Sequence, residues 1–331
     1  MSNRNKTRSA DRSGSLDESD SDENIQTILQ NRLDYFIEQD FNSTPYLIMT
    51  VFGDSVIPHG SEIWLGSLVE LLERLQINER LIRTSIFRLS KDGWLEGTKV
   101  GRKSFYRPAI WEDINHNERV IYHPQNKWDG NWRLIIGMSM EKVSHNREDF
   151  RKALQKYGFL PIAPNVFAHP TFDYKDIEKL MIDHGVNQSY LIASAQDFEG
   201  QSLEFSQIDN VLQRNTMALL EKEYLDYFNC YEPFFRYVRQ IGSLSPMDCF
   251  LLNSLMINDY RRLLHHDHYQ TNQIFNDEWI GRKARSMTAK IYCAAAPLSR
   301  EYFCSVAQNS QGGLPKMEKR FHQRFKHLES S

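Results

Sequence analysis

The chain has 331 residues, of which 40% are hydrophobic and 12% aromatic, and its formal net charge is −3 at pH 7. This length provides for two or three domains, and the composition is sufficient for real hydrophobic cores. No run of about 18 apolar residues is present, so the sequence predicts no membrane-spanning helix.

Residues 1–24 are polar throughout and lack the apolar stretch of a signal peptide. They bury too little apolar surface to offset the entropy of ordering, so we expect a disordered tail, with weak DNA contact through its basic residues left open. The four cysteines are widely spaced and show no metal-type pairing. Reduced thiols and a cytoplasmic protein are therefore expected.

Two apolar helices are expected after the tail. Residues 45–56 have the apolar content of a buried helix, and Pro58 and Gly60 end it. Residues 63–72 predict a second helix with its leucines facing inward. Only a short turn around Gln76 separates this helix from the next one, which is the spacing of a helix-turn-helix.

The stretch 77–95 predicts a helix with one buried face and one basic face. Asn78 suits the N-cap and Gly93 the position just past the C-terminus. At about 100° per residue, apolar or small side chains share one arc: Leu81, Ile82, Ser85, Ile86 and Leu89. The opposite arc holds the candidate DNA-contacting residues Arg80, Arg83, Thr84, Arg88 and Lys91.

A basic hairpin is expected next, with strands at 94–97 and 103–107 and a turn at 98–102. Its candidate phosphate contacts are Lys99, Arg102 and Lys103. Residues 73–107 contain nine Lys and Arg against four Asp and Glu, an excess typical of phosphate contact. The sequence thus predicts a winged helix-turn-helix DNA-binding domain over 25–110, although an ordinary helix with a solvated face stays an alternative. Phe87 projects on the arginine side, and its role is left open.

These same segments carry a family resemblance, at residues 52–56, 64–68, 77–89 and 92–95, and more sparsely at 132–134, 157–159, 163–166, 259–262 and 279–281. Over roughly 44–305 the chain resembles PaaX-type regulators, the repressors of bacterial phenylacetic-acid degradation operons. The resemblance implies an α+β multidomain protein: an N-terminal winged helix, a central ferredoxin-like dimerisation domain and a helical C-terminal domain. It also implies a homodimer on double-stranded operator DNA, released by phenylacetyl-CoA, with neither a cofactor nor enzymatic activity.

Residues 111–200 show the alternating pattern of a small α/β domain. Strands are expected at 132–140, 166–168 and 190–194, and helices at 148–157 and 174–184. The resemblance relates this part to a CRISPR-adaptation nuclease fold that holds a metal at an acidic residue ending the first strand. Here no carboxylate occurs before Glu141, so we expect the fold without the chemistry, and exposed Met and Trp on the sheet favour a dimer surface.

Residues 201–331 predict helices at 205–241, 247–264 and 284–306, with Pro297 as a kink or break. The basic tail 316–327 is expected to be frayed or loosely packed. His265, His266 and His268 lie on one turn and cannot converge on a metal without other partners. Arg261 and Arg262 are candidate contacts for coenzyme A phosphates, or alternatively members of internal ion pairs.

No catalytic or metal-binding motif stands out, and three alternatives stay open. The first is a regulator of another aromatic or acyl-CoA pathway with a different effector. The second is a metal-dependent nuclease built on the central domain. The third is an architectural DNA-binding protein that responds to no ligand.

Overall fold

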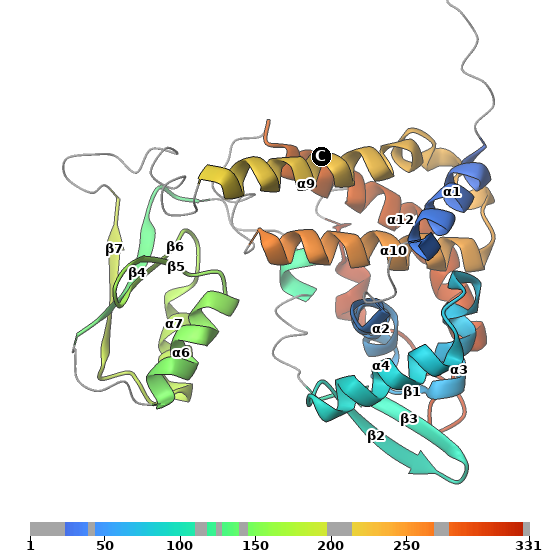
Figure 1. The fold of residues 1–331 in the computed structure, drawn as a ribbon, viewed down its shortest axis with the longest axis horizontal. Coiled ribbons are helices and arrows are strands. Elements are labelled where there is room, and N and C mark those ends of the chain that lie inside the picture. Colours follow the sequence, from blue (N-terminus) through green and yellow to red (C-terminus); the bar gives the residue numbers. More distant parts are fainter. Residues whose placement is uncertain are drawn as a thin grey trace, which may run out of the picture.

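The computed structural model describes residues 24–38, 44–109, 118–123, 128–138, 145–196, 214–267 and 278–326. The predicted tail lies outside these residues apart from Asn24, and so do the predicted domain boundaries at 110/111 and 200/201. Figure 1 shows a larger unit made of the N- and C-terminal elements and a smaller, separate unit made of the central ones. Among the described residues, no helix has both the length and the apolar character needed to cross a membrane.

The N-terminal elements form a helical layer that ends in a three-stranded sheet. In chain order they are α1 (Ile25–Glu38), α2 (Thr44–Val51), a π-helical turn η2 (Phe52–Val56), a 3-10 turn η3 (Ile57–His59), β1 (Ile63–Trp64), α3 (Leu65–Leu72), η4 (Glu73–Leu75), α4 (Glu79–Lys91), β2 (Leu95–Val100) and β3 (Lys103–Pro108). The sheet order is β1-β3-β2, and α2 packs against α4.

Two sequence expectations need correction here. The predicted helix at 63–72 begins only at Leu65, because Ile63 and Trp64 pair with β3 opposite Tyr106 and Phe105. The predicted turn at 98–102 is shorter than expected, because β2 runs to Val100 and pairs with β3 along its whole length. The partner of β1 lies about 40 residues further along the chain, whereas β2 is extended by pairing with the next strand of its own hairpin. Helical periodicity reports neither pairing.

The central unit is a four-stranded antiparallel sheet with two helices. Its elements are β4 (Trp132–Gly137), α6 (His145–Lys156), β5 (Leu160–Ala163), β6 (Val166–His169), α7 (Tyr174–Asp183) and β7 (Tyr190–Ala195). The order β5-β6-β4-β7 and the β-α-β-β-α-β sequence are those of a ferredoxin-like fold, as predicted. Strand β5 was missed because it has four residues and contains Pro161.

Both faces of this sheet are apolar. Ile135 and Phe167 face a core shared with α6 and α7, whereas Trp132 and Leu134 belong to a second cluster on the other face. Trp132 is only 2% exposed, so the expectation of an exposed Trp there is wrong, while Met138 is 51% exposed as expected.

The C-terminal elements are α9 (Arg214–Arg236), η5 (Val238–Ser243), α10 (Pro246–His266), α12 (Ile280–Val306) and η6 (Lys319–Gln323). The expected helix at 205–241 overlaps α9 and η5, and residues 205–213 lie outside the described part. Helix α10 begins where predicted, since the Ser245 side chain caps it by accepting from the Asp248 N–H. Helix α12 continues through Pro297, so that residue does not end it.

One hydrophobic core joins the N-terminal and C-terminal elements. It contains Leu47 of α2, Ile82 of α4, Leu255 of α10 and Ala295 of α12, all fully or almost fully buried. Helix α10 packs against α2 as well as α12, and α1 packs against α9. The helix predicted to read DNA therefore packs on α2, and α2 in turn packs on α10 of the C-terminal half.

The last described residues also pack against this core. Residues 315–326, called here the C-terminal strap, follow the outside of the larger unit and insert Phe321 and Phe325, which are 3% and 0% exposed. The Phe325 N–H donates to the Tyr122 carbonyl at 2.8 Å, and its ring lies 5.4 Å from that of Tyr292. The expectation of a frayed or loosely packed end is therefore wrong for residues 316–326.

Candidate nucleic-acid-binding surface

Helix α4 forms for the local reasons that the sequence indicated. The Asn78 side chain accepts from the Leu81 N–H at 2.8 Å, which satisfies one of the free donors of the first turn. Gly93 follows the helix with φ of +77°, a conformation that favours glycine. The helix buries Ile82, Ser85, Ile86 and Leu89. Its opposite face is consequently presented to solvent.

The five predicted contact residues of α4 all lie on this exposed face: Arg80, Arg83, Thr84, Arg88 and Lys91. Two of them have partners within the helix. The Arg83 guanidinium donates to Glu79 at 2.8 and 2.5 Å, and the Thr84 hydroxyl donates to the Arg80 carbonyl at 2.8 Å. The Arg83–Glu79 pair is more than half exposed, so its contribution to stability is about 0.3–0.5 kcal/mol and it separates readily.

The hairpin that follows projects beside α4. Its turn is Gly101-Arg102, where Gly101 has φ of +61°, and Lys99 and Arg102 are exposed. The third predicted hairpin contact, Lys103, directly follows the turn and has partners outside the hairpin. Its ammonium lies 4.1 Å from the centre of the Trp64 ring and donates to Gln308 at 3.1 Å. Lys103 therefore links the hairpin to β1 and to the segment just after α12.

The Trp64 ring holds its place because residue 66 is glycine. A Cβ at Gly66 would stand 2.5 Å from the Trp64 ring, closer than real carbon contacts. The sequence showed Gly66 only as a residue within a helix, where glycine costs about 1 kcal/mol relative to alanine. Its packing against Trp64 explains why it stands there.

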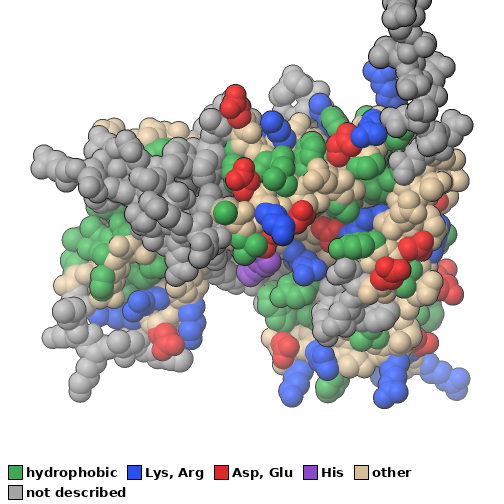
Figure 2. Space-filling model, turned by 45° about the horizontal axis from the view of Figure 1, so that its top comes forward, with side chains coloured by type: hydrophobic (Ala, Val, Ile, Leu, Met, Phe, Trp, Pro, Cys, Tyr) green, Lys and Arg blue, Asp and Glu red, His purple; other side chains and the backbone are tan. Residues whose placement is uncertain are grey.

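The cations of this surface differ in whether a carboxylate pairs with them. Among the described residues, no ion pair involves these side chains: Arg80, Arg88, Lys91, Lys99 and Arg102. Arg107, by contrast, pairs with Glu96 across the hairpin at 2.8 Å. Figure 2 shows Lys and Arg side chains projecting at the lower edge of the larger unit, the end at which α4 and the hairpin lie in Figure 1.

Phe87 lies on the same face as these cations and is 69% exposed. It therefore does not pack under the hairpin. An exposed ring among arginines is available for contact with a partner.

A buried polar network, which sequence reasoning missed, lies at the turn that follows α2. Asp54 is 9% exposed, and its Oδ1 accepts from the hydroxyls of Tyr122 and Tyr292 at 2.9 and 2.8 Å. Burial together with Asp54 raises the pKa of Tyr292, so this phenol stays protonated. A carboxylate within the apolar run 47–57 was the available signal, because a buried charge requires a partner.

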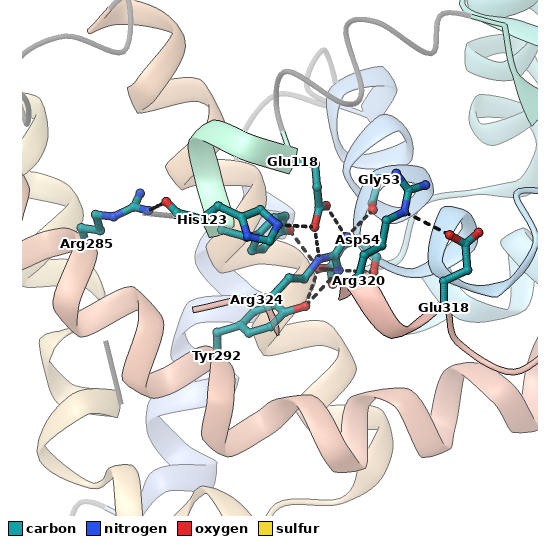
Figure 3. A network of polar contacts seen from close by, with 10 residues as sticks. Gly53, Asp54, Glu118, His123, Arg285, Tyr292, Glu318, Arg320 and Arg324 are labelled. Carbon is teal, nitrogen blue, oxygen red and sulfur yellow. Dashed lines mark hydrogen bonds and ion pairs between the residues drawn. The ribbon is translucent and has the colours of Figure 1, made fainter. Parts of the chain in front are cut away.

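That partner is Arg324 of the C-terminal strap (Figure 3). One guanidinium nitrogen donates to Asp54 Oδ1 at 3.0 Å, and two others bind Glu118 bidentately at 2.8 and 2.6 Å. The carbonyls of Gly53 and Asp54 accept at 2.9 and 2.7 Å. Burial alone would lower the pKa of Arg324, but the surrounding tyrosines and Glu118 outweigh it and the pKa is raised. The strap is thereby fastened to the turn that follows α2.

The predicted effector contacts lie elsewhere, on α10. Arg261 donates to the Thr50 hydroxyl at 2.8 Å, and Arg262 is exposed. The neighbouring Asp259 forms a buried ion pair with Arg32 of α1 and accepts from Tyr231 at 2.6 Å. An ion pair through Asp259 therefore joins this segment of α10 to α1, while the roles of Arg261 and Arg262 stay predictions.

No constellation of metal ligands occurs among the described residues. His266 contacts Glu223 at 3.0 Å, and His268 lies outside them. Glu141, the first carboxylate after β4, also lies outside them.

Comparisons with known proteins agree with this layout. Three family models match in order: PaaX-like protein at residues 43–109, the PaaX protein central Cas2-like domain at 125–205 and the PaaX-like protein C-terminal domain at 216–305. The Transcriptional repressor PaaX of Escherichia coli strain K12 is 29% identical over 308 residues, covering 89% of this chain and 95% of that protein. Among solved structures, the uncharacterized protein Rv0674 from Mycobacterium tuberculosis matches with 16% identity and a TM-score of 0.37, covering 72% of this chain and 89% of that one. Since three models of one family occupy most of the chain in the family's order, the chain belongs to the PaaX family.

Proposed function

We propose that this PaaX-type repressor binds operator DNA through a winged helix-turn-helix made of α2, α3, α4 and the β2-β3 hairpin. The observation that carries the proposal is the row of unpaired, exposed cations on α4 beside a projecting basic hairpin. An α-helix fits the major groove, where arginine reads guanine, and a hairpin alongside it reaches phosphates or the minor groove. The protein acts by occupying DNA and has no catalytic role.

The cations of this surface have different expected roles in DNA binding. Arg88 and Arg80 have no competing carboxylate among the described residues, so they are free for base or phosphate contact. Arg83 must leave Glu79, and a bidentate guanine contact worth about 1–3 kcal/mol exceeds the small cost of separating that exposed pair. Lys99 and Arg102 at the hairpin tip bind phosphates, whereas Lys103 keeps the hairpin in position.

The repressor acts as a homodimer assembled through the central unit. The sheet face opposite α6 and α7 carries apolar side chains, among them Ile136, Ala193 and Leu191, and Leu191 is 51% exposed. An exposed apolar strand face of this kind favours self-association. A two-fold dimer would place two α4 helices in major grooves about 34 Å apart or a multiple of that distance.

Phenylacetyl-CoA releases the repressor from the operon for phenylacetate catabolism. Release requires the ligand to bind the DNA-free form better than the DNA-bound form. The support is family membership, together with a C-terminal half that shares its core with α4 and therefore reaches the DNA-binding surface.

The DNA-binding proposal is tested by selecting duplexes from a random pool with the full-length protein and measuring affinity by fluorescence anisotropy. Arg88→Ala should weaken binding by about 1–3 kcal/mol and relax preference at one base position. Arg107→Ala is the matched control, because that hairpin arginine is already paired with Glu96. Failure to enrich any sequence, or equal affinities for both variants, would refute the assignment.

Dimerisation is tested by sedimentation. Leu191→Glu should yield monomers, whereas Ile182→Glu should not, since Ile182 is equally apolar and 62% exposed but lies on α7. A dimer that survives Leu191→Glu contradicts this interface.

Separate experiments test the alternative functions. Titrating the protein–DNA complex with phenylacetyl-CoA, other acyl-CoA esters and free phenylacetate distinguishes this pathway from a neighbouring one and from a ligand-insensitive architectural protein. A cleavage assay with Mg²⁺ or Mn²⁺ tests the nuclease hypothesis, in which the central unit would degrade nucleic acid.

A further inference from the structure

Phe87 lies near the middle of the outward face of α4. Four side chains mark the buried direction of the helix: Ile82, Ser85, Ile86 and Leu89. At about 100° per residue, a second row lies opposite to them: Arg80, Thr84, Phe87 and Lys91. Arg83 and Arg88 lie on either side of this row, each roughly 70° from its centre line. The side chains that point most directly away from the protein therefore include a phenyl ring.

The ring of Phe87 is 69% exposed. Among the described residues, no other aromatic ring packs against it and no cation lies over it. Single exposed apolar side chains are common on protein surfaces and need no function. What distinguishes Phe87 is the set of groups beside it.

A shallow hollow beside the ring is lined by Phe87 and four neighbours on α4: Glu79, Arg80, Arg83 and Thr84. The Thr84 hydroxyl donates to the Arg80 carbonyl at 2.8 Å, so it is turned toward the helix backbone and the methyl group of Thr84 is left facing outward. The Arg83 guanidinium donates to Glu79 at 2.8 and 2.5 Å, which offsets both charges. The hollow is thus bounded by a ring, a methyl group and arginine stems, with charge at its rim.

The floor of the DNA major groove offers one apolar group. Base edges there present hydrogen-bond donors and acceptors, and thymine alone adds a C5-methyl group. A phenyl ring forms no strong hydrogen bond, so this methyl group is the one that it fits. The cations around the hollow fit the phosphates that border the groove. The hollow and its rim therefore match a thymine between two phosphate backbones.

We propose that this hollow receives the C5-methyl group of a thymine, so that Phe87 and Thr84 read a T·A pair in the sequence that α4 recognises. The inference rests on the proposed function, because it requires α4 to lie in the major groove. Phe87 thereby supplies base specificity, while the cations around it supply charge. Burial of one methyl group corresponds to about a fourfold gain in affinity.

A second protein is a poorer match for the same surface. Arg80 and Lys91 have no carboxylate partner among the described residues, and an apolar protein face would have to remove water from both to reach the ring. DNA reaches the ring while bringing phosphates to these cations, which replaces the lost water with charged hydrogen-bond acceptors. The charges around Phe87 therefore favour DNA as the partner.

The test exchanges thymine for deoxyuridine, which pairs in the same way but lacks the C5-methyl group. Each thymine of the DNA selected by the full-length protein is replaced in turn, and affinity is measured by anisotropy at one fixed salt concentration. The natural protein is compared with Phe87→Ala and with Phe87→Leu, which keeps an apolar side chain. Tyr35→Ala is the matched control, because Tyr35 is an aromatic residue that is 56% exposed on α1, at the other end of the larger unit from the hairpin (Figure 1).

Deoxyuridine at one thymine position should weaken binding by the natural protein about threefold to fivefold. Phe87→Ala should bind the unsubstituted DNA at least threefold more weakly and lose most of the deoxyuridine effect at that position, because the ring that contacts the methyl group is gone. Phe87→Leu should retain part of the effect, and Tyr35→Ala all of it. Because both aromatic rings are exposed, the variants should unfold at close to the natural midpoint.

The outcomes separate this inference from the proposed function. If no DNA sequence is selected, the proposed function fails and the inference fails with it. If DNA is selected and bound but no thymine shows a deoxyuridine effect, the inference is overturned and the proposed function stands. A deoxyuridine effect that persists in full in Phe87→Ala assigns the methyl group to another residue and also overturns it. The same holds if Phe87→Ala binds DNA normally but sediments differently from the natural protein, because the ring then serves a protein contact.

Discussion

Replacing Arg324 by methionine should destabilise the larger unit far more than any surface change in the strap. Methionine keeps much of the apolar stem but removes every guanidinium donor. The change leaves Asp54 and Glu118 without their cation, although their side chains are only 6% and 13% exposed. Removing one partner of a buried ion pair typically costs about 3–5 kcal/mol, because the remaining charge is uncompensated. We expect this loss, which corresponds to a Tm lower by on the order of 10 °C.

Arg320→Met is the matched control. Arg320 lies in the same strap and contacts Glu318 at 3.0 Å, but both side chains are more than half exposed. Exposed pairs contribute about 0–1 kcal/mol, so this variant should unfold close to the natural midpoint. The comparison holds residue type and chain position almost constant and varies only the burial of the pair.

Urea and thermal unfolding, followed by circular dichroism, measure both variants. A second change sharpens the result: adding Asp54→Asn to Arg324→Met should recover part of the loss, since one orphaned charge is gone. Equal destabilisation by Arg324→Met and Arg320→Met would refute the reasoning, because the strap would then be held by its phenylalanines alone.

Three further outcomes are expected. Gly60→Ala should lower the free energy of unfolding by about 1–3 kcal/mol, because Gly60 has φ of +95° and a Cβ would lie 2.5 Å from Pro315 Cγ. Gly312→Ala is the control: Gly312 has φ of +90° but open space around it, so this change should cost less in a parallel thermal melt. Burial lowers the pKa of His59 below 6.5, the value expected in the unfolded chain. As pH falls below 6.5 the unfolded chain therefore binds a proton more readily than the native state, and the free energy of unfolding decreases. His59→Gln should show a shallower decrease down to about pH 5 in urea titrations. Phe87→Ala should leave the unfolding midpoint within about 0.5 kcal/mol yet weaken DNA binding in anisotropy, and unchanged affinity would place that ring outside the interface.

Helix α4 was predictable because its determinants are local. A cap at Asn78, a stop at Gly93 and a 3.6-residue period between them suffice to place the helix and its two faces. The exposed cations follow from the same period, and so does the exposure of Phe87. Nothing distant is needed to predict these features.

The strap and its network were not predictable in the same way. Residues 316–327 are basic and carry spaced aromatics, a pattern equally consistent with a frayed end. Their burial depends on Asp54 and Tyr122, which lie about 270 and 200 residues earlier in the chain, respectively. Periodicity does not encode such partners. Asp54 within an apolar run indicates that a cation must pair with it, but the sequence does not identify that cation.

The hollow beside Phe87 is only partly visible in the sequence. The helical period places Phe87 among the arginines, but it does not report how the neighbouring side chains are held. Only the structure shows that the Thr84 hydroxyl donates to the Arg80 carbonyl and that Glu79 binds Arg83. These contacts depend on side-chain rotamers, which periodicity does not encode.

The shared core has a consequence for how the protein is made. Arg32 and Asp259 are 227 residues apart, and Asp54 and Arg324 are 270 apart. At about 5–20 residues per second, a ribosome needs roughly 11–54 s to synthesise the second partner after the first. During that interval the basic face of α4 exists on an unfinished support. On the proposed function, a newborn chain would therefore bind DNA only once α10, α12 and the strap have been synthesised, and an interrupted translation product would leave the operator unoccupied.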